Sequence, residues 1–429
     1  MLMLYSGLVW IWVATPLQAQ SLLTLEEVIQ QVLAHNFEIQ IARNKQKIAD
    51  QNHRLGKADF LPVLDATIQM DKSHQNSSQK YGEDPQLSTG IELKWPIFKG
   101  MRRIFNYQQL GKQLQISQLD VQHKIEEKIT EVIIGYYNLA LAQKKKHVLE
   151  DALSVAKEVL QVAKVKYEVG QCSKLEYLNA QVQHNEEQTK LWSQEEVLTA
   201  AKFTLYSLMS KDGLEEFAIV ENIPAPTRLS WERLTDAVAA ANTSIRITQK
   251  RYEKATLAVK MKRADLWPQV DFSLGYNLGW PWRDQRWEVA PRGFNYGISI
   301  SFNLFNAFRH ATAIREASIL ADNVHWELRA QTLQLEAELK KQFMHYTQQL
   351  QRYELAQEHV RVSQENMTVA LEQYRLGGIA LLELDKARQN AQETELKYWD
   401  VRYNTKVAEV TLRKLSGILL DGSLRDVVG

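Results

Sequence analysis

The sequence has one cysteine in 429 residues, Cys172, so an internal disulfide is excluded. It contains no glycine-rich phosphate loop, no His-Glu-x-x-His and no Gly-x-Ser-x-Gly. No two of its ten histidines are four residues apart, so a helical metal-ligand pair is not expected. The net charge of +1 gives no electrostatic attraction to nucleic acid. We therefore expect neither an enzyme nor a cofactor, metal or nucleic-acid partner.

Glycine and proline are scarce, with 18 and 9 residues, while helix-favouring residues are abundant. Residues 101–169 contain no proline and only two glycines. This range predicts one helix of roughly 100 Å at ~1.5 Å per residue, too long for a compact domain. Its apolar residues recur three and four positions apart, which indicates coiled-coil packing. They include Leu153, Ala156, Val159, Leu160, Ala163 and Tyr167.

Residues 1–19 are mostly apolar and end in "TPLQA", which is typical of a signal peptide and too short for a confident spanning helix. No lysine or arginine precedes the apolar run, unlike the usual form. We expect export, with the mature chain beginning near Gln20.

The chain contains an internal duplication. The stretch "ADFLPVLDATIQMD" at 58–71 is matched by "ADLWPQVDFSLGYN" at 264–277. Early pairs are 206 residues apart (268 − 62 = 206), and later pairs are 207 apart (377 − 170 = 207). They include Asn36 with Asn242, Pro62 with Pro268, Gly90 with Gly297, Arg102 with Arg309, Tyr167 with Tyr374, and Gly170 with Gly377. The sequence therefore predicts two tandem units, 20–228 and 229–429, the second with a short C-terminal tail.

Each unit should contain a helix, two strands, a long helix and a further helix. In the first unit we expect a helix over about 25–60 and strands at about 62–71 and 88–98. In the second we expect strands at about 268–278 and 294–305. The final helices should cover 174–209 and 380–415. The class is thus mainly α with a small β portion.

The strands alternate apolar and polar residues over about ten positions, as transmembrane β-strands do. A soluble antiparallel sheet with one solvent-exposed face has the same pattern. Aromatic residues at the strand ends favour the interpretation as transmembrane strands over a soluble sheet. We predict that the lipid-facing residues include Ile68, Leu93, Leu274 and Ile300. We predict that the lumen-facing residues include Thr67, Glu92, Ser273 and Ser299.

Four strands cannot close a barrel, because the smallest barrels need about eight. Closure therefore requires other copies of the chain. Two copies would give eight strands around a filled interior, and three would give twelve strands with room for a passage.

The chain resembles the TolC-type outer-membrane efflux family over essentially the whole mature sequence. The resemblance rests on three duplicated motifs: "ADFLP" and "ADLWP", "WPIFKGMRR" and "FNLFNAFRH", and "YEVGQCSKLEYLNAQ" and "YRLGGIALLELDKAR". It implies a homotrimer with a twelve-strand outer-membrane barrel, continuous with a periplasmic α-helical coiled-coil tunnel. The implied function is the exit duct of a tripartite efflux pump or type I secretion system. Such a duct would passively conduct cargo from an inner-membrane transporter, through a periplasmic adaptor (membrane fusion) protein. The alternative is a structural coiled-coil protein of the periplasm or cell surface, without a transport role.

The same resemblance identifies candidate residues at the helical-hairpin tips. It places the turns at Gly170, Gly377 and Gly378. Glu383 occupies the position of an acid that often lines the closed inner mouth, with Asp385 and Lys386 beside it. The first-unit counterpart of Glu383 is Glu176, and Ile379 stands where some members have an arginine. The alternative for these charges is an ordinary solvated helix surface.

Overall fold

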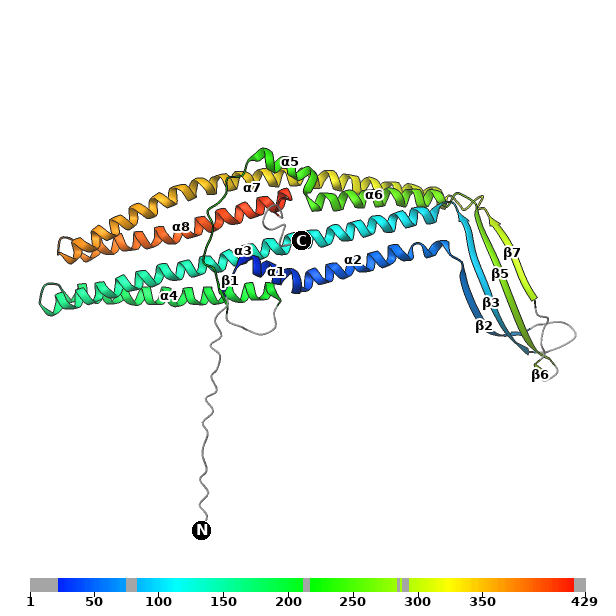
Figure 1. Ribbon diagram of the computed structural model, residues 1–429, viewed down its shortest axis with the longest axis horizontal. Helices are drawn as coiled ribbons and strands as arrows, with labels where there is room; N and C mark the ends of the chain where they lie inside the picture. The colour runs from blue at the N-terminus through cyan, green and yellow to red at the C-terminus, as the bar shows by residue number, and fades with distance from the viewer. Residues whose placement is uncertain (1–21, 75–82, 211–216, 284–285, 288–292, 420–429) are drawn as a thin grey trace, which may run out of the picture.

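The computed structural model describes residues 22–74, 83–210, 217–283, 286–287 and 293–419. The expected signal peptide lies outside the described residues. Long helices run side by side along the molecule, and a small sheet extends from one end (Figure 1). None of the described helices has a stretch long and apolar enough to cross a membrane.

The two units repeat the same elements. The first contains α1 (Leu25–His35), α2 (Phe37–Leu55), η1 (Ala58–Phe60), β2 (Val63–His74), β3 (Glu83–Lys99), α3 (Arg102–Glu168) and α4 (Lys174–Met209). The second contains α5 (Trp231–Ala241), α6 (Thr243–Ala264), β5 (Gln269–Arg283), β6 (Arg286–Trp287), β7 (Gly293–Ser301), α7 (Arg309–Arg375) and α8 (Leu381–Ser416). The short strands β1 (Leu22–Leu23) and β4 (Ala218–Ile219) pair in parallel. Both ends of α3 and α4 are displaced by 207 residues in α7 and α8 (309 − 102 = 207; 416 − 209 = 207).

The helix expected over about 25–60 is interrupted at Asn36, which is extended and separates α1 from α2. Its Oδ1 atom accepts hydrogen bonds from the backbone N–H groups of Glu38 (3.0 Å) and Ile39 (3.3 Å). Its Nδ2 atom donates to the carbonyl of Leu208, 3.2 Å away. Asn242 repeats this arrangement at the start of α6, donating to the carbonyl of Leu415 at 2.9 Å. Each asparagine thus caps one helix and ties it to the end of another.

The sheet has the order β2-β3-β5-β7, with every neighbouring pair antiparallel. One row of opposed residues runs Leu64, Leu93, Leu274 and Tyr296. The strands differ in length from expectation: β2, β3 and β5 are longer, while β7 ends at Ser301. A bulge between Pro96 and Phe98 places Phe98 opposite Val270. The regular alternation expected over about 88–98 is therefore interrupted at Ile97, because the bulge inserts an extra residue beside a proline that has no N–H to donate.

The helices form a layer whose contacts follow the order α2, α3, α6 and α7. Beyond the middle of the molecule, α3 packs against α4 and α8, and α7 packs against α8 (Figure 1). The main core surrounds Tyr136, whose side chain is fully buried. Its hydroxyl donates to the carbonyl of Leu23 (3.0 Å) and accepts from the backbone N–H of Val220 (3.2 Å). This core joins the short β1–β4 pair to α3.

Candidate pore-lining surfaces and hairpin tips

The strand register separates the two predicted sets of residues onto opposite faces of the sheet. Opposed residues in an antiparallel sheet share a face, and faces alternate along each strand. The register brings Thr67, Glu92, Ser273 and Ser299 onto one face. It brings Ile68, Leu93, Leu274 and Ile300 onto the other. Ile68 and Ile300 are 81% and 71% exposed in the single chain. The assignment of these faces to lipid and lumen stays a prediction.

The polar face carries a charge cluster within and between strands, and cross-strand glycine–asparagine pairs. Lys94 lies 3.0 Å from Glu92 and 3.8 Å from Asp65, measured between the amine and carboxylate atoms. Gly90 is opposite Asn277, and a β-carbon on Gly90 would lie 2.3 Å from the Asn277 Oδ1 atom. The asparagine amide therefore lies directly over the glycine, in space that a side chain would fill.

The two hairpin tips have the same backbone geometry, with Gly170 (φ +76) and Gly377 (φ +78) in the left-handed region. The N–H of the following residue bonds back to the carbonyl of Lys166 (2.7 Å) in one tip and Gln373 (2.8 Å) in the other. This is the Schellman helix end, which favours glycine. Gly378 does not have a positive φ, and its backbone N–H is the group that donates to the Gln373 carbonyl.

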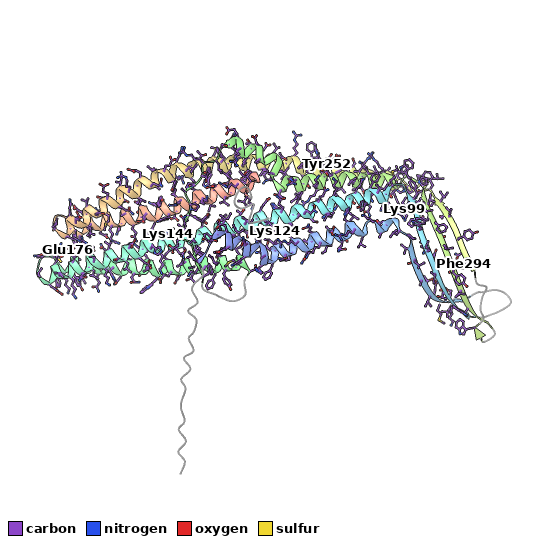
Figure 2. All side chains as sticks on the ribbon, viewed as in Figure 1. Lys99, Lys124, Lys144, Glu176, Tyr252 and Phe294 are labelled. Atoms are coloured by element: carbon purple, nitrogen blue, oxygen red, sulfur yellow. The ribbon has the colours of Figure 1, made fainter. Side chains whose placement is uncertain are left out.

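Tyr374 joins the two hairpins near their tips. Its ring is buried, and the Lys166 Nζ atom lies 4.0 Å from the ring centroid. The Tyr374 hydroxyl donates to Glu176 Oε1 at 3.4 Å, at the end of the molecule marked in Figure 2. Burial, together with the nearby carboxylate of Glu176, raises the pKa of Tyr374 to about 12. Arg375 and Glu158 form a further ion pair between the hairpins, with Nε and Oε1 2.9 Å apart.

The candidate Asp385 is buried in a charge cluster between α4 and α8. Arg388 donates to Asp385 Oδ1 and to Glu187 Oε1, both at 2.9 Å. The Arg388 and Glu187 side chains are 5% and 1% exposed. Burial opposes ionisation of Glu187, but hydrogen bonds from Arg388, Lys190 and Gln392 outweigh it and lower the Glu187 pKa. In the single chain, α8 therefore turns the Asp385 side chain toward α4, where Arg388 and Gln389 bind its carboxylate, and its place at the aperture stays a prediction.

Glu383 and Lys386 lie on the exposed side of α8, three residues apart. Their neighbours Leu381 and Leu384 point into the apolar cluster shared by the two hairpins. The structure thus leaves Glu383 and Lys386 as aperture candidates on one face of the helix.

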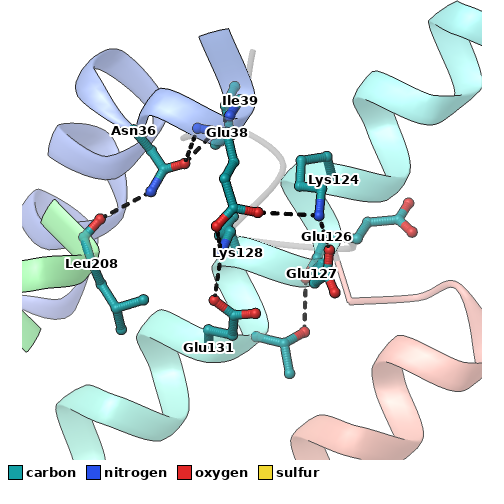
Figure 3. Close-up of polar contacts among 10 residues, drawn as sticks. Asn36, Glu38, Ile39, Lys124, Glu126, Glu127, Lys128, Glu131 and Leu208 are labelled. Atoms are coloured by element: carbon teal, nitrogen blue, oxygen red, sulfur yellow. Dashed lines mark hydrogen bonds and ion pairs between the residues drawn. The ribbon is translucent and has the colours of Figure 1, made fainter. Parts of the chain in front are cut away.

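A charged cluster that the sequence did not predict lies where α2 meets α3 (Figure 3). The buried Lys128 amine lies 2.5 Å from Glu38 Oε1 and 2.8 Å from Glu131 Oε2. Hydrogen bonding from Lys128 lowers the pKa of Glu38, with Lys124 adding to the effect. These contacts hold the start of α2 against α3, next to the cap made by Asn36. Charge spacing along one helix could suggest Lys128 with Glu131, but not Glu38, which is distant in sequence.

A sequence model of the family described as outer membrane efflux protein matches residues 28–211 and 234–418. The chain belongs to this family. The two matched segments fall in the two repeated units. Family membership places the chain in the outer membrane, from which it extends into the periplasm. Members of the family are trimeric channels that work with adaptor proteins and inner-membrane transporters.

Two curated relatives match the chain, and the printed name of one of them is that of a secretion protein. CyaE of Bordetella pertussis is 22% identical over 300 residues, covering 69% of this chain and 63% of CyaE. The alkaline protease secretion protein AprF of Pseudomonas aeruginosa is 25% identical over 150 residues, covering 35% of this chain and 31% of AprF. The chain thus spans less than two thirds of either relative.

Among solved structures, the fold is similar to the CmeC outer membrane channel of Campylobacter jejuni. The TM-score is 0.78 at 16% sequence identity, covering 94% of this chain and 88% of CmeC. At this identity the likeness concerns the fold alone. The chain thus has the fold of solved outer-membrane channel subunits.

Proposed function

We propose that the protein is the outer-membrane exit duct of a tripartite efflux pump or a type I secretion system. Three copies would form a barrel that contacts outer-membrane lipid, together with a periplasmic helical tunnel. A periplasmic adaptor (membrane fusion) protein and an inner-membrane transporter would deliver the cargo, and the duct would conduct it passively. The repeats, 20–228 and 229–429, would each supply one strand pair and one helical hairpin, after removal of residues 1–19.

The observation that carries this proposal is the sheet. It has one apolar and one polar face and two open edges, and it continues directly into the long helices α3 and α7. A sheet with both edges unpaired needs further strands. An apolar outer surface around a polar interior suits a membrane barrel. The family match and the name of the relative AprF support an export role over a purely structural coiled coil.

The inner mouth would be formed by the hairpin tips. Glu383 is exposed on α8 beyond the tip turn, so three copies could ring a narrow opening. Lys386 on the same face would offset part of that charge. The candidate lumen residues Thr67, Glu92, Ser273 and Ser299 would line the barrel.

Purified full-length protein tests the proposal in two ways. Mass measurement in mild detergent should give three chains, and planar bilayers should show discrete conductance steps. A heat-denatured sample at the same protein concentration is the control for detergent leakage. A monomer or dimer that adds no conductance would contradict the proposal.

A further inference from the structure

Basic residues gather where the strands of the sheet meet the helices, near Lys99 (Figure 2). The stretches that join strands to helices are 56–61, 99–105, 260–267 and 302–310. They contain eight lysine and arginine residues and two aspartates, a net charge of +6 in a chain whose net charge is +1. We call these eight residues the basic belt: Lys57, Lys99, Arg102, Arg103, Lys260, Lys262, Arg263 and Arg309.

Both aspartates of these stretches already have partners within the chain. Asp265 Oδ1 lies 2.7 Å from Arg102 Nη1, and Asp59 Oδ2 accepts a hydrogen bond from Asn106 at 2.8 Å. Among the residues that the structure describes, no carboxylate is within ion-pair distance of the other basic side chains of the belt. Most of the positive charge is therefore open to anions from outside the chain.

A pocket of about 240 Å³ opens within the basic belt, between the start of α3 and the end of α6. Lys260 and Arg263 line it, three residues apart and therefore on one side of α6. Its apolar lining side chains are Phe98, Met101, Phe105 and Trp267. Met101 and Trp267 are 57% and 62% exposed. The pocket thus offers an apolar surface with two cations beside it.

The walls of this pocket belong to one chain. It lies at the junction of the two repeats, where β3 pairs with β5 and α3 packs against α6. A β-carbon on Gly100 would lie 2.1 Å from the carbonyl oxygen of Ala264, and both residues line the pocket. Because the turn before α3 and the end of α6 are in close contact, the pocket is formed without a second copy.

The pocket continues the apolar face of the sheet. The bulge places Phe98 opposite Val270, which is on the same face as Leu274 because faces alternate along β5. Trp95 also lies on this face, and its indole N–H donates to the carbonyl of Phe60 at 3.1 Å. Aromatic residues beside basic ones are typical of the boundary between a membrane and water.

We propose that the pocket binds an anionic phospholipid of the periplasmic leaflet of the outer membrane. The inference rests on the proposed duct in one respect. In that duct the sheet crosses the outer membrane and the helices lie in the periplasm, which puts the basic belt at the periplasmic leaflet.

The side chains define how such a lipid would bind. Arg263 would bind two phosphate oxygens with its planar guanidinium, and Lys260 would add a point charge. The first carbons of the acyl chains would pack on Phe98 and Trp267. The pocket is smaller than the ~300–1,000 Å³ typical of drug-sized ligands, so the remaining chain length would lie along the apolar face.

Charge complementarity selects the class of lipid. A zwitterionic headgroup brings its own cation next to the phosphate, and that cation would face the open charges of the belt. An anionic headgroup brings net negative charge, which basic pockets at membrane surfaces attract. A lipid held here would fix the depth at which the helices leave the membrane.

Native mass spectrometry of the full-length protein in mild detergent tests the site, with palmitoyl-oleoyl phosphatidylglycerol as the probe. Lys260→Gln combined with Arg263→Gln should weaken binding roughly 20-fold. The matched control is Lys99→Gln combined with Lys262→Gln, which removes the same charge from the belt at positions that do not line the pocket. This control should keep most of the binding. An equal loss in both double variants would overturn the pocket, because the belt would then attract lipid without a defined site.

Three further arms define the chemistry. The charge-preserving variant Lys260→Arg with Arg263→Lys should bind clearly better than the double glutamine variant, which separates loss of charge from loss of folding. Trp267→Ala should weaken binding of the phospholipid, and glycerol phosphate, which has no acyl chains, should not compete for the site. Phosphatidylcholine should bind far more weakly than phosphatidylglycerol. Equal binding of the two lipids would overturn recognition of an anionic headgroup.

Lipid A carries phosphates too, but it belongs to the opposite leaflet. It should not displace phosphatidylglycerol from the parent protein at equal concentration. Displacement that depends on Lys260 and Arg263 would overturn the assignment to a phospholipid of the periplasmic leaflet.

The lipid site and the duct fail in different experiments. A trimer that conducts in bilayers but does not prefer phosphatidylglycerol would remove the lipid site and leave the duct intact. A protein that is neither trimeric nor conducting, yet binds phosphatidylglycerol through Lys260 and Arg263, would remove the duct and keep the lipid site.

Discussion

At the scale of single residues, adjacent positions on a strand have opposite environments. Leu274 and Ser273 are neighbours in β5 that point to opposite faces of the sheet. If the apolar face contacts lipid, Leu274→Arg near mid-bilayer should lower the free energy of unfolding by about 2–4 kcal/mol, and Ser273→Arg should lower it far less. The measurement is the urea-induced unfolding of the reconstituted barrel, with each variant compared with the parent protein. Equal costs at the two positions would show that the faces are wrongly assigned.

The buried pair Glu187–Arg388 is a second residue-scale case. Glu187→Gln should be strongly destabilising, by about 3–5 kcal/mol, because it leaves the Arg388 guanidinium buried with fewer partners. Glu393→Gln, an exposed ion-pair partner on α8, is the matched control and should change little. Chemical denaturation followed by circular dichroism measures both. Similar small losses in the two variants would mean that the cluster does not hold α8 to α4.

The same carboxylate predicts a pH dependence. The pKa of Glu187 is lower in the folded protein than its ordinary value of 4.5. Its contribution to the free energy of unfolding is therefore complete above about pH 4.5 and is lost as the pH falls through the lowered pKa. Stability profiles of the parent protein and Glu187→Gln should converge in acid. Parallel profiles across this range would contradict the assignment.

At the scale of elements, Gly100 and Gly170 show two different physical reasons why a turn position requires glycine: a left-handed backbone and a close contact with another element. Both have positive φ values, of 56 and 76, but only Gly100 has a backbone oxygen 2.1 Å from where a β-carbon would lie. Gly170→Ala should cost roughly 1–2 kcal/mol for the left-handed backbone alone. Gly100→Ala should cost clearly more, because α6 must also move away from β3. The denaturant concentrations at the unfolding midpoints of the two variants measure this difference. Equal midpoints would show that the close contact at Gly100 does not contribute to the loss of stability.

Local patterns in the sequence predicted the strands, the long helices and the duplication, because periodicity and repeated spacing are properties of the chain itself. They missed the cap at Asn36, where the partner carbonyl belongs to Leu208 in a distant helix. They also missed the bulge beside Pro96. They also did not indicate that Asp385 is buried in the single chain, because the burial of a helix position depends on which neighbour the helix meets. Arg388 and Gln389, three and four residues later on the same helix, bind its carboxylate.

At the scale of the whole molecule, the proposed duct needs other copies of the chain to complete the barrel and the tunnel. Both α2 and α7 carry large apolar side chains that are exposed in the single chain, among them Phe37 and Trp326. Such residues suit an interface between separately folded chains, since burying apolar surface drives association.

The charge at the inner mouth also belongs to the assembly. Three copies of Glu383 around a narrow aperture would focus a negative potential between low-dielectric walls and attract cations. Glu383→Gln should lower cation selectivity and weaken block by divalent cations in single-channel recordings, and Lys386→Gln should shift selectivity the other way. Asp385→Asn is the control on the buried side of α8: it should lower stability through Arg388 and leave selectivity unchanged. If Asp385→Asn alters selectivity while Glu383→Gln does not, α8 must rotate on assembly and bring its presently buried face to the pore.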